Sequence, residues 1–257
     1  MTNNTLKILS IVIVLQSLFC LPSLAEEDNK LHFSGFGRFI VGHLDDQNAE
    51  YAGYTNKLSV NKQSLLGLQA DYTFNNKFSV TTQFVAYTED QRNSGLEWLY
   101  ATYQPNNALR IKLGRQRIPF FNYSDSLDVG FAYPWLTLPQ QFYDTAFFST
   151  FDGILANYEF PISGGYINYE AYWGRFDDKI YLASTEIDTK VIGLVGFNAT
   201  LGYNNFTLRA SYNEGDVNIK QDEAAQFSEI LRQLGCDKNA DWLNANALIQ
   251  FYQFSAN

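Results

Sequence analysis

The side chains that could support catalysis are few and widely spaced. The 257-residue sequence contains two histidines, His32 and His43, and only His43 is followed closely by a pair of acids, Asp45 and Asp46. A hydrolase needs a histidine that a carboxylate orients toward a nucleophile or a water molecule. The sequence has no G-x-S-x-G motif that would supply such a nucleophile. We therefore predict that the protein is not an enzyme, with a hydrolase built on His43 as the alternative.

Residues for metal and cofactor sites are also scarce. Two cysteines and two histidines are too few for a disulfide framework or a Cys/His metal centre. The adjacent acid pairs Glu26-Glu27 and Asp177-Asp178 point apart or into solvent, which makes them poor acid/base dyads. A net charge of −9 and an aromatic content of 16% argue against a nucleic-acid partner and against a disordered chain. We expect no cofactor and no bound metal.

The N-terminus has the order of a secretory signal peptide. Lys7 supplies a positive charge, residues 8–19 form an apolar run, and a small-residue cleavage site ends at Ala25. Removal of this segment takes away one lysine and no acid, so the mature chain stays acidic. We predict that residues 1–25 are a signal peptide and that residues 26–257 form the mature domain, exported from the cytoplasm.

Beyond this leader, apolar and polar residues alternate with the period of two that is typical of β-strands. In Phe206–Asn213, for example, the apolar residues fall on one face, while Thr207, Arg209 and Ser211 fall on the other. The same alternation predicts nine strands and a candidate tenth: Leu31–Val41, Leu66–Phe74, Phe78–Phe84, Trp98–Tyr103, Leu109–Leu113, Ile154–Phe160, Ile167–Trp173, Phe197–Tyr203, Phe206–Asn213 and, as the tenth, Ala247–Phe254.

The connections between these strands alternate in length. A long connection is followed by a short turn throughout, and the short turns are built from turn-forming residues such as Asn, Pro and Gly. Each hairpin would therefore have its tight turn at one end of the sheet and its large loop at the other. This sorting is typical of a transmembrane β-barrel, which has short periplasmic turns and longer outer loops. The long connections span residues 44–63, 88–95, 119–147, 176–189 and 214–245.

Aromatic residues flank the short turns on the apolar face of the strands. They are Tyr72, Phe74, Phe78, Tyr103, Tyr158, Phe160, Tyr203 and Phe206. In a closed barrel they would form a ring at one interface of the outer-membrane lipid. We therefore predict an all-β fold, an antiparallel transmembrane β-barrel. A secreted β-sandwich that binds a ligand is the alternative, but it does not account for the sorted loops.

The polar face of the strands would line the interior of such a barrel, as a wet passage or as a hydrogen-bonded plug. The basic residues of this wall are Arg38, Arg110, Lys112 and Arg209, and its acidic residues are Asp71, Glu159 and Glu170. The wall charges are thus nearly balanced, whereas the excess acid lies in the long connections.

The third long connection is rich in stiff and bulky residues. Arg115 and Arg117 lie at its start, and Asp125, Asp128 and Asp144 follow along it. A loop of this length and apolar content is costly to leave in water. We predict that it folds back into the barrel, narrows the passage and places its acids opposite the basic wall. The resulting transverse field would sort solutes by charge and size.

At these residues the sequence resembles the Gram-negative outer-membrane porins. The resemblance is carried by Leu113–Arg115, directly before the third long loop, and by the segment Asp128–Trp135. It implies that this loop is the constriction, with its three acids facing the four basic wall residues, while Arg115 and Arg117 fit either side. It also implies passive diffusion of small hydrophilic solutes or ions through a pore, and a homotrimer.

The number of strands differs from that family. Porins of this kind have around 16 strands, whereas the pattern accounts for nine or ten. The aromatic Phe254 near the C-terminus is followed by three more residues. We expect a chain that is incomplete at its C-terminus and forms part of a 16-strand barrel, with a small ten-strand barrel as the alternative.

The fifth long connection contains one helical pattern. Asp222 can cap its start, apolar residues share one face, and the pattern ends at Leu234 before Gly235. We expect a short loop helix over Asp222–Leu234.

Overall fold

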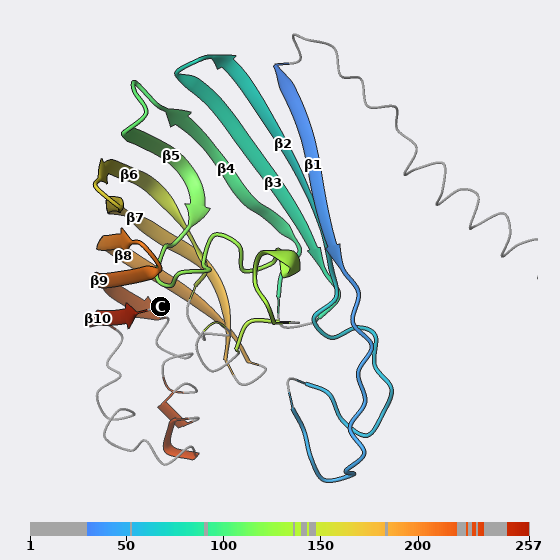
Figure 1. Ribbon diagram of the computed structural model, residues 1–257. Coiled ribbons are helices and arrows are strands. Elements are labelled where there is room, and N and C mark those ends of the chain that lie inside the picture. The colour runs from blue at the N-terminus through green and yellow to red at the C-terminus, as the bar shows by residue number, and fades with distance from the viewer. Residues whose placement is uncertain are drawn as a thin grey trace, which may run out of the picture. The chain divides into compact units, whose positions relative to one another are not determined.

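The alternating segments form ten antiparallel strands (Figure 1). Each strand pairs with the next one in the sequence, so the strands make a single sheet in the order β1 to β10. This confirms the prediction of an all-β antiparallel fold and replaces the two-sheet sandwich. The strands are β1 Leu31–Arg38, β2 Leu65–Asn75, β3 Phe78–Tyr87, β4 Gly95–Tyr103, β5 Leu109–Arg117, β6 Thr150–Ile162, β7 Gly165–Leu182, β8 Thr185–Tyr203, β9 Phe206–Ile219 and β10 Asn246–Ala256.

The structure is a computed structural model. It describes residues 30–51, 53–89, 92–135, 137–139, 143, 148–182, 185–219, 225, 228–229, 231–233 and 246–256. The predicted signal peptide and Asp144 lie outside these residues. Within them, β1 pairs with β2 and β10 pairs with β9, and the two end strands do not pair with each other. The sheet is therefore open, and the predicted barrel is not closed.

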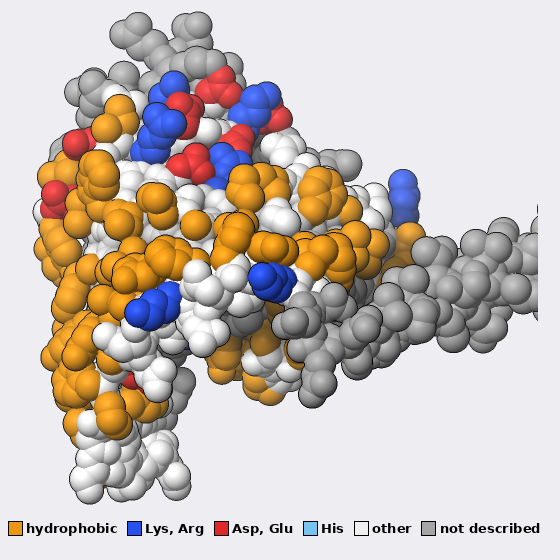
Figure 2. Space-filling view, turned by 90° about the horizontal axis from the view of Figure 1, so that it is seen from above, with side chains coloured by type: hydrophobic (Ala, Val, Ile, Leu, Met, Phe, Trp, Pro, Cys, Tyr) orange, Lys and Arg blue, Asp and Glu red, His pale blue; other side chains and the backbone are white. Residues whose placement is uncertain are grey.

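The two faces of the sheet differ in polarity, as the alternation predicts. Phe33 on β1, Leu68 on β2 and Leu113 on β5 are 71%, 60% and 62% exposed on the apolar face. Figure 2 shows hydrophobic side chains gathered in a continuous band, with charged side chains grouped beside it. On the opposite, polar face, Gln83 and Asn198 are among the buried polar side chains. The sheet thus buries its polar face and exposes its apolar one, the reverse of a globular protein in water.

The aromatic residues beside the short turns lie on the apolar face. The rings of Phe78 and Tyr103 on neighbouring strands stack with centroids 4.6 Å apart, and those of Tyr158 and Phe160 lie 6.0 Å apart. Phe206, next to another turn, is 70% exposed. These rings leave one end of the sheet with a row of exposed aromatic surface, the location that amphipathic rings favour at a membrane interface.

One predicted loop is wrong. Residues 176–189 do not form a long connection, because β7 and β8 continue past the rest of the sheet and stay paired as far as Leu182 and Thr185. The charges that suggested a loop lie opposite each other across this hairpin, since Asp177 is the partner of Lys190 and their Oδ2 and Nζ atoms are 3.0 Å apart. Opposite charges at facing positions stabilise paired strands in water, and a run of charges alone does not reveal this.

The hydrophobic core of the described residues lies on the polar side of the sheet, beneath the loop that follows β5. It contains Ile118, Phe151, Leu155, Tyr172, Phe176, Val191 and Leu194. The side chains of Ile118, Phe151 and Val191 are each only 1% exposed. The loop therefore packs on the polar face of β6, β7 and β8 through this apolar cluster.

Among the described residues, a 3-10 turn covers Gly130–Ala132. In the predicted loop helix, the described residues 225, 228–229 and 231–233 are helical, and both predicted ends, Asp222 and Leu234, lie outside the described residues. Among the residues that the structure describes, no helix has the length and apolar character needed to cross a membrane.

Candidate functional site

The loop between β5 and β6, residues 118–149, lies against the concave, polar face of the sheet (Figure 1). Local turns shape its first part, because the Phe121 N–H donates to Ser124 Oγ over 2.9 Å and the Val129 N–H donates to Ser126 O over 2.9 Å. Serine side chains that bond nearby backbone groups favour such turns. The β5–β6 loop is then attached to the sheet at separate points along its length.

The start of the β5–β6 loop is attached to β8, β9 and β10. The Pro119 carbonyl accepts a hydrogen bond from Asn198 Nδ2 over 3.1 Å and another from Arg209 Nη2. The rings of Phe120 and Phe121 lie edge-on to Phe251 of β10, with centroids 6.1 and 5.8 Å away. These contacts fix the first residues of the loop beside the last strands of the sheet.

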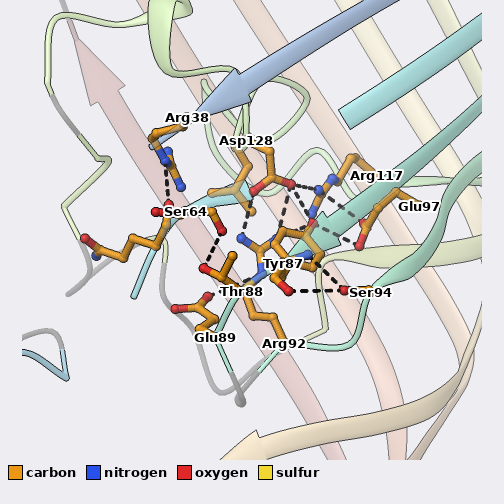
Figure 3. A network of polar contacts seen from close by, with 12 residues as sticks. Arg38, Ser64, Tyr87, Thr88, Glu89, Arg92, Ser94, Glu97, Arg117 and Asp128 are labelled. Carbon is orange, nitrogen blue, oxygen red and sulfur yellow. Dashed lines mark hydrogen bonds and ion pairs between the residues drawn. The ribbon is translucent and has the colours of Figure 1, made fainter. Parts of the chain in front are cut away.

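The middle of the loop is attached through Asp128 (Figure 3). Its Oδ1 lies 2.7 Å from Arg92 Nη1, and its Oδ2 accepts from Arg117. The Tyr87 hydroxyl lies 2.8 Å from the same Oδ2. Asp128 is only 3% exposed, and a buried charge is stable only when it is paired and hydrogen-bonded. Asp128 therefore connects the loop to β3, β5 and the β3–β4 connection.

The partners of Asp128 also contact one another. The Tyr87 hydroxyl accepts a hydrogen bond from Arg92 Nη2 over 2.7 Å, and the Arg92 guanidinium carbon lies 3.7 Å from the centre of the Tyr87 ring. Arg117 Nη2 is 3.2 Å from Glu97 Oε2. We call these five residues, Tyr87, Arg92, Glu97, Arg117 and Asp128, the Asp128 network. Two cations and two carboxylates share it, so its charge is balanced within the protein.

The Asp128 carboxyl is strongly acidic in this network. Burial by itself would raise the pKa of Asp128, but the charges of Arg92 and Arg117 and the hydrogen bonds from Arg92 and Tyr87 outweigh burial. Its pKa therefore lies well below the ordinary value. A group whose pKa is lowered by folding stabilises the folded state above its unfolded pKa, and this stabilisation is lost as the pH falls toward the folded pKa.

We expect the β5–β6 loop to stay attached on acidification until the pH falls below about 3.9, the ordinary pKa of an aspartate. Further acidification should then protonate Asp128 and weaken its ion pairs with Arg92 and Arg117 progressively. Near-ultraviolet circular dichroism, recorded from neutral pH down to about pH 2, follows the packing of the loop aromatics. Loss of this signal already at about pH 5 would contradict the assignment, because Asp128 would still be ionised there.

Arg38 of β1 makes a further attachment. Its Nη1 donates to the Tyr133 hydroxyl over 3.1 Å, and its Nε donates to the Gln63 carbonyl over 2.9 Å. The Tyr133 hydroxyl in turn donates to the Leu127 carbonyl over 3.1 Å. Arg38 thus joins the β5–β6 loop to the connection between β1 and β2. Together, the attachments carry the loop across the polar face from the last strands to the first.

The strand register places all seven predicted wall residues on the polar face. Lys112 lies with its Nζ 4.9 Å from the centre of the Tyr100 ring. Arg110 is exposed, and its Nε lies 3.4 Å from Gln104 Oε1. Arg38 and Arg209 contact the β5–β6 loop, as described above. The residues with this placement are Arg38, Arg110, Lys112, Arg209, Asp71, Glu159 and Glu170.

The acidic wall residues sit in different surroundings. Asp71 accepts hydrogen bonds from Thr81 Oγ1 over 2.6 Å and from Gln69 Nε2 over 2.8 Å. Glu170 accepts one from Asn198 Nδ2 over 2.8 Å, beside the attachment of the loop. Glu159 is exposed near a short turn. Amide and hydroxyl side chains therefore bond the carboxylates of Asp71 and Glu170 without neutralising their charges.

Asp125, another acid predicted for the constriction, has an exposed side chain on the β5–β6 loop. Asp144, predicted for the same role, lies outside the described residues.

Two residues assigned to the constriction do not present their charge to a passage. Arg117 and Asp128 are 4% and 3% exposed, and they neutralise each other within the Asp128 network. Arg115 belongs to β5, and its Nε and Nη2 bond Asp152 of β6 over 2.9 and 3.3 Å. The buried charges of Arg117 and Asp128 need a partner within the protein, because an unpaired buried charge is strongly destabilising. These three residues hold the loop and the strand ends in place.

Tyr87, Arg92 and Glu97 were not predicted as site residues. Arg92 lies within the predicted long connection 88–95, and its partner Asp128 is 36 residues away in the sequence. Glu97 lies at the irregularity in the β3–β4 pairing, between Leu96 and Trp98, where the alternation is disturbed. An arginine in a predicted loop that carries few other cations was the available signal, but nothing local identified its partner.

His43, the histidine of the alternative hydrolase, lies beside one of the acids that follow it. His43 Nδ1 lies 3.4 Å from Asp45 Oδ1, but the Asp45 side chain is fully exposed. A catalytic histidine requires a carboxylate in a protected position and a nucleophile or water on its other side. No group of three or more His, Cys, Asp or Glu side chains in the described part of the chain is arranged to hold a metal ion.

Comparisons with known proteins give structural similarities only. No model of a known protein family matches the chain, and no curated protein sequence matches it. Among solved structures, the chain is similar to the loop L8 deletion mutant of OmpT, an outer membrane protein of Vibrio cholerae, with a TM-score of 0.33 and 10% identity over 75% of this chain and 72% of that one. It is also similar to in-vitro folded OmpT of Vibrio cholerae in its trimer form, with a TM-score of 0.32 and 10% identity over 75% of this chain and 68% of that one. For outer-membrane expressed OmpT of Vibrio cholerae, the TM-score is 0.30 and the identity 9%, over 76% of this chain and 67% of that one.

Proposed function

We propose that the protein is an outer-membrane channel for the passive diffusion of small hydrophilic solutes or ions, and that the β5–β6 loop is its constriction. The attachment of this loop across the polar face is the observation that carries the proposal. The loop is fixed at Pro119 by Asn198 and Arg209, and at Asp128 by Arg92 and Arg117. A loop held against a polar, concave wall narrows the space that the wall encloses.

The apolar face supports the membrane part of the proposal. Its side chains are exposed over every strand, and large hydrophobic surfaces of this kind mark an interface with lipid or with another protein. The rows of aromatic residues at the short turns fit a headgroup boundary. In this proposal the chain is exported behind a signal peptide, contacts outer-membrane lipid and assembles as a homotrimer, which chemical crosslinking in isolated outer membranes tests.

The charge of the wall provides the test of the channel itself. Arg110→Glu reverses one exposed charge on the polar face, so it should shift the permeability ratio toward cations. Each unit charge is worth on the order of 1 kcal/mol at 4 Å in water, which corresponds to a several-fold change in this ratio. The measurement is the reversal potential of single channels in planar bilayers under a salt gradient.

Three outcomes would contradict the channel. Absence of stepwise conductance from detergent-purified protein in planar bilayers would contradict the channel directly. Ester or peptide hydrolysis that is abolished by His43→Ala, without conductance, would favour the outer-membrane hydrolase instead. Recovery of the mature protein from culture fluid or periplasm without detergent would favour a secreted binding protein.

A further inference from the structure

A cavity of about 450 Å³ opens between the long connections at the loop end of the sheet. Its walls come from the β1–β2 and β3–β4 connections, the β5–β6 loop and the extended hairpin of β7 and β8. This volume lies within the range of roughly 300–1,000 Å³ that is typical of sites for small molecules. We call it the loop cavity. It holds charges of both signs as well as apolar side chains.

Most charged residues of the loop cavity are already paired within the protein. Arg92 bonds Asp128, Arg115 bonds Asp152, and Lys179 bonds Glu186. Lys62, Glu50 and Asp178 also line the cavity, and none of them forms an ion pair with any described residue. The cavity therefore retains charges of both signs that contacts among the described residues do not neutralise.

Arg38 and Glu89 are further charged residues of the cavity wall, and they add to these unpaired charges. Arg38 bonds a carbonyl and a tyrosine hydroxyl but no described carboxylate, and the contact of Glu89 with Arg92 is long, at 4.0 Å. Both act on the hydroxyl of Tyr54, whose pKa is raised first by burial and then by Glu89, and lowered by Arg38. The same hydroxyl donates to the Lys62 carbonyl over 2.9 Å. Arg38 and Glu89 thus both act on one buried tyrosine, whose hydroxyl also contacts the backbone of Lys62 in the β1–β2 connection.

Part of the wall of the loop cavity is apolar, beside the charged residues Asp178 and Lys179 of the β7–β8 hairpin. Phe176 is 7% exposed, its ring stacks on that of Phe148 with centroids 4.6 Å apart, and Ile180 packs against the same cluster. All three line the cavity. A ligand that leaves water here would gain both apolar contact and charge contact.

We propose that the loop cavity binds small zwitterions that carry an apolar side chain, such as short peptides with free termini. The carboxylate would face Lys62 and Arg38, the ammonium group would face Glu89 and Glu50, and the side chain would lie on the apolar part of the wall. An anion alone or a cation alone would leave one pair of charges unmatched. The inference rests on the proposed channel only in treating the bound compound as a solute held at its entrance.

The test is the binding of four forms of one dipeptide to the full chain in detergent, measured by isothermal titration calorimetry. The four probes are Ala-Phe with free termini, its N-acetyl form, its C-terminal amide and the form blocked at both ends. Ala-Phe should bind roughly threefold to fivefold more tightly than either singly blocked form, the gain that one partly exposed ion pair gives. The doubly blocked form should bind most weakly.

Two variants assign the charges. Lys62→Gln should reduce the preference for Ala-Phe over its amide, since Arg38 alone then faces the carboxylate, and should leave the preference over the N-acetyl form unchanged. Glu89→Gln should do the reverse. Lys57→Gln and Glu229→Gln are the matched controls, because both residues are exposed and neither lines the cavity. Both control proteins should keep both preferences.

The outcomes separate this inference from the proposed function. Equal affinity for all four probes, or no binding to a protein that conducts in bilayers, would overturn the inference and leave the channel. Preferences that stay undiminished in both Lys62→Gln and Glu89→Gln would also overturn it. Charge-selective binding by a protein that never conducts would instead uphold the binding site and overturn the channel.

Discussion

Asp128→Asn is expected to release the β5–β6 loop from the polar face. The substitution keeps the shape of the side chain but removes the charge that Arg92 and Arg117 share. Arg117 is already without hydrogen-bond partners for its Nε and Nη1 among the described residues, so it would depend on Glu97 alone. Removing one member of a buried ion pair costs about 3–5 kcal/mol. This exceeds what exposed contacts elsewhere in the loop can replace.

Single-channel conductance and limited proteolysis measure this release. A detached loop should widen the passage, so Asp128→Asn should conduct more than the unmodified protein and be cleaved faster within residues 118–135. Asp125→Asn is the matched control, since it makes the same chemical change in the same loop at an exposed side chain. It should leave proteolysis unchanged. Equal conductance and equal cleavage in the two variants would contradict the anchoring role of Asp128.

Phe33→Arg is expected to impair assembly in the membrane. Phe33 lies on the apolar face of β1 opposite Ala70 and is 71% exposed. An arginine on the lipid face of a barrel costs about 2–4 kcal/mol near the midplane of the bilayer. In a protein surrounded by water the same exposed change would cost little. The yield of folded protein after insertion into liposomes measures the difference.

Ser34→Arg is the control for this second experiment. Ser34 is the next residue, is also exposed, and points to the polar face, where it is opposite Gln69. A water-filled interior should accept the added charge. If both variants insert equally well, the apolar face does not contact lipid. If only Phe33→Arg fails, the orientation of the sheet follows, because both variants introduce the same charge at adjacent positions on opposite faces.

The alternation of side chains predicted the ten strands, because one face of the sheet is apolar along its whole length. In β2, for example, Leu66, Leu68 and Tyr72 lie at alternate positions and are exposed on the apolar face. The pattern failed where this constraint ends. Beyond Trp173 the hairpin of β7 and β8 has no need of an apolar outer face, so Asp177 and Lys190 occupy its strands. A period of two in polarity cannot identify strands that are polar on their outer face.

The sequence predicted which face of the sheet the basic wall residues occupy, but it did not predict the ion pairs of Asp128. Register placed the four basic wall residues on the polar face, since a strand fixes which face each side chain occupies. The charge of Asp128 was expected to face the wall across a gap, whereas the structure buries it against Arg92 and Arg117. Ion pairs between segments far apart in the sequence depend on how loops pack, and strand periodicity contains no information about that.

The extended hairpin of β7 and β8 has one more consequence. Its strands supply the Phe176 and Ile180 side of the loop cavity, and their backbones are hydrogen-bonded to each other up to the tip. A paired ribbon is preorganised, so it loses little conformational entropy when a molecule settles against it. Whatever rearrangement accompanies binding at this end of the molecule would therefore be borne by the segments facing the ribbon, while the ribbon itself acts as a stationary template.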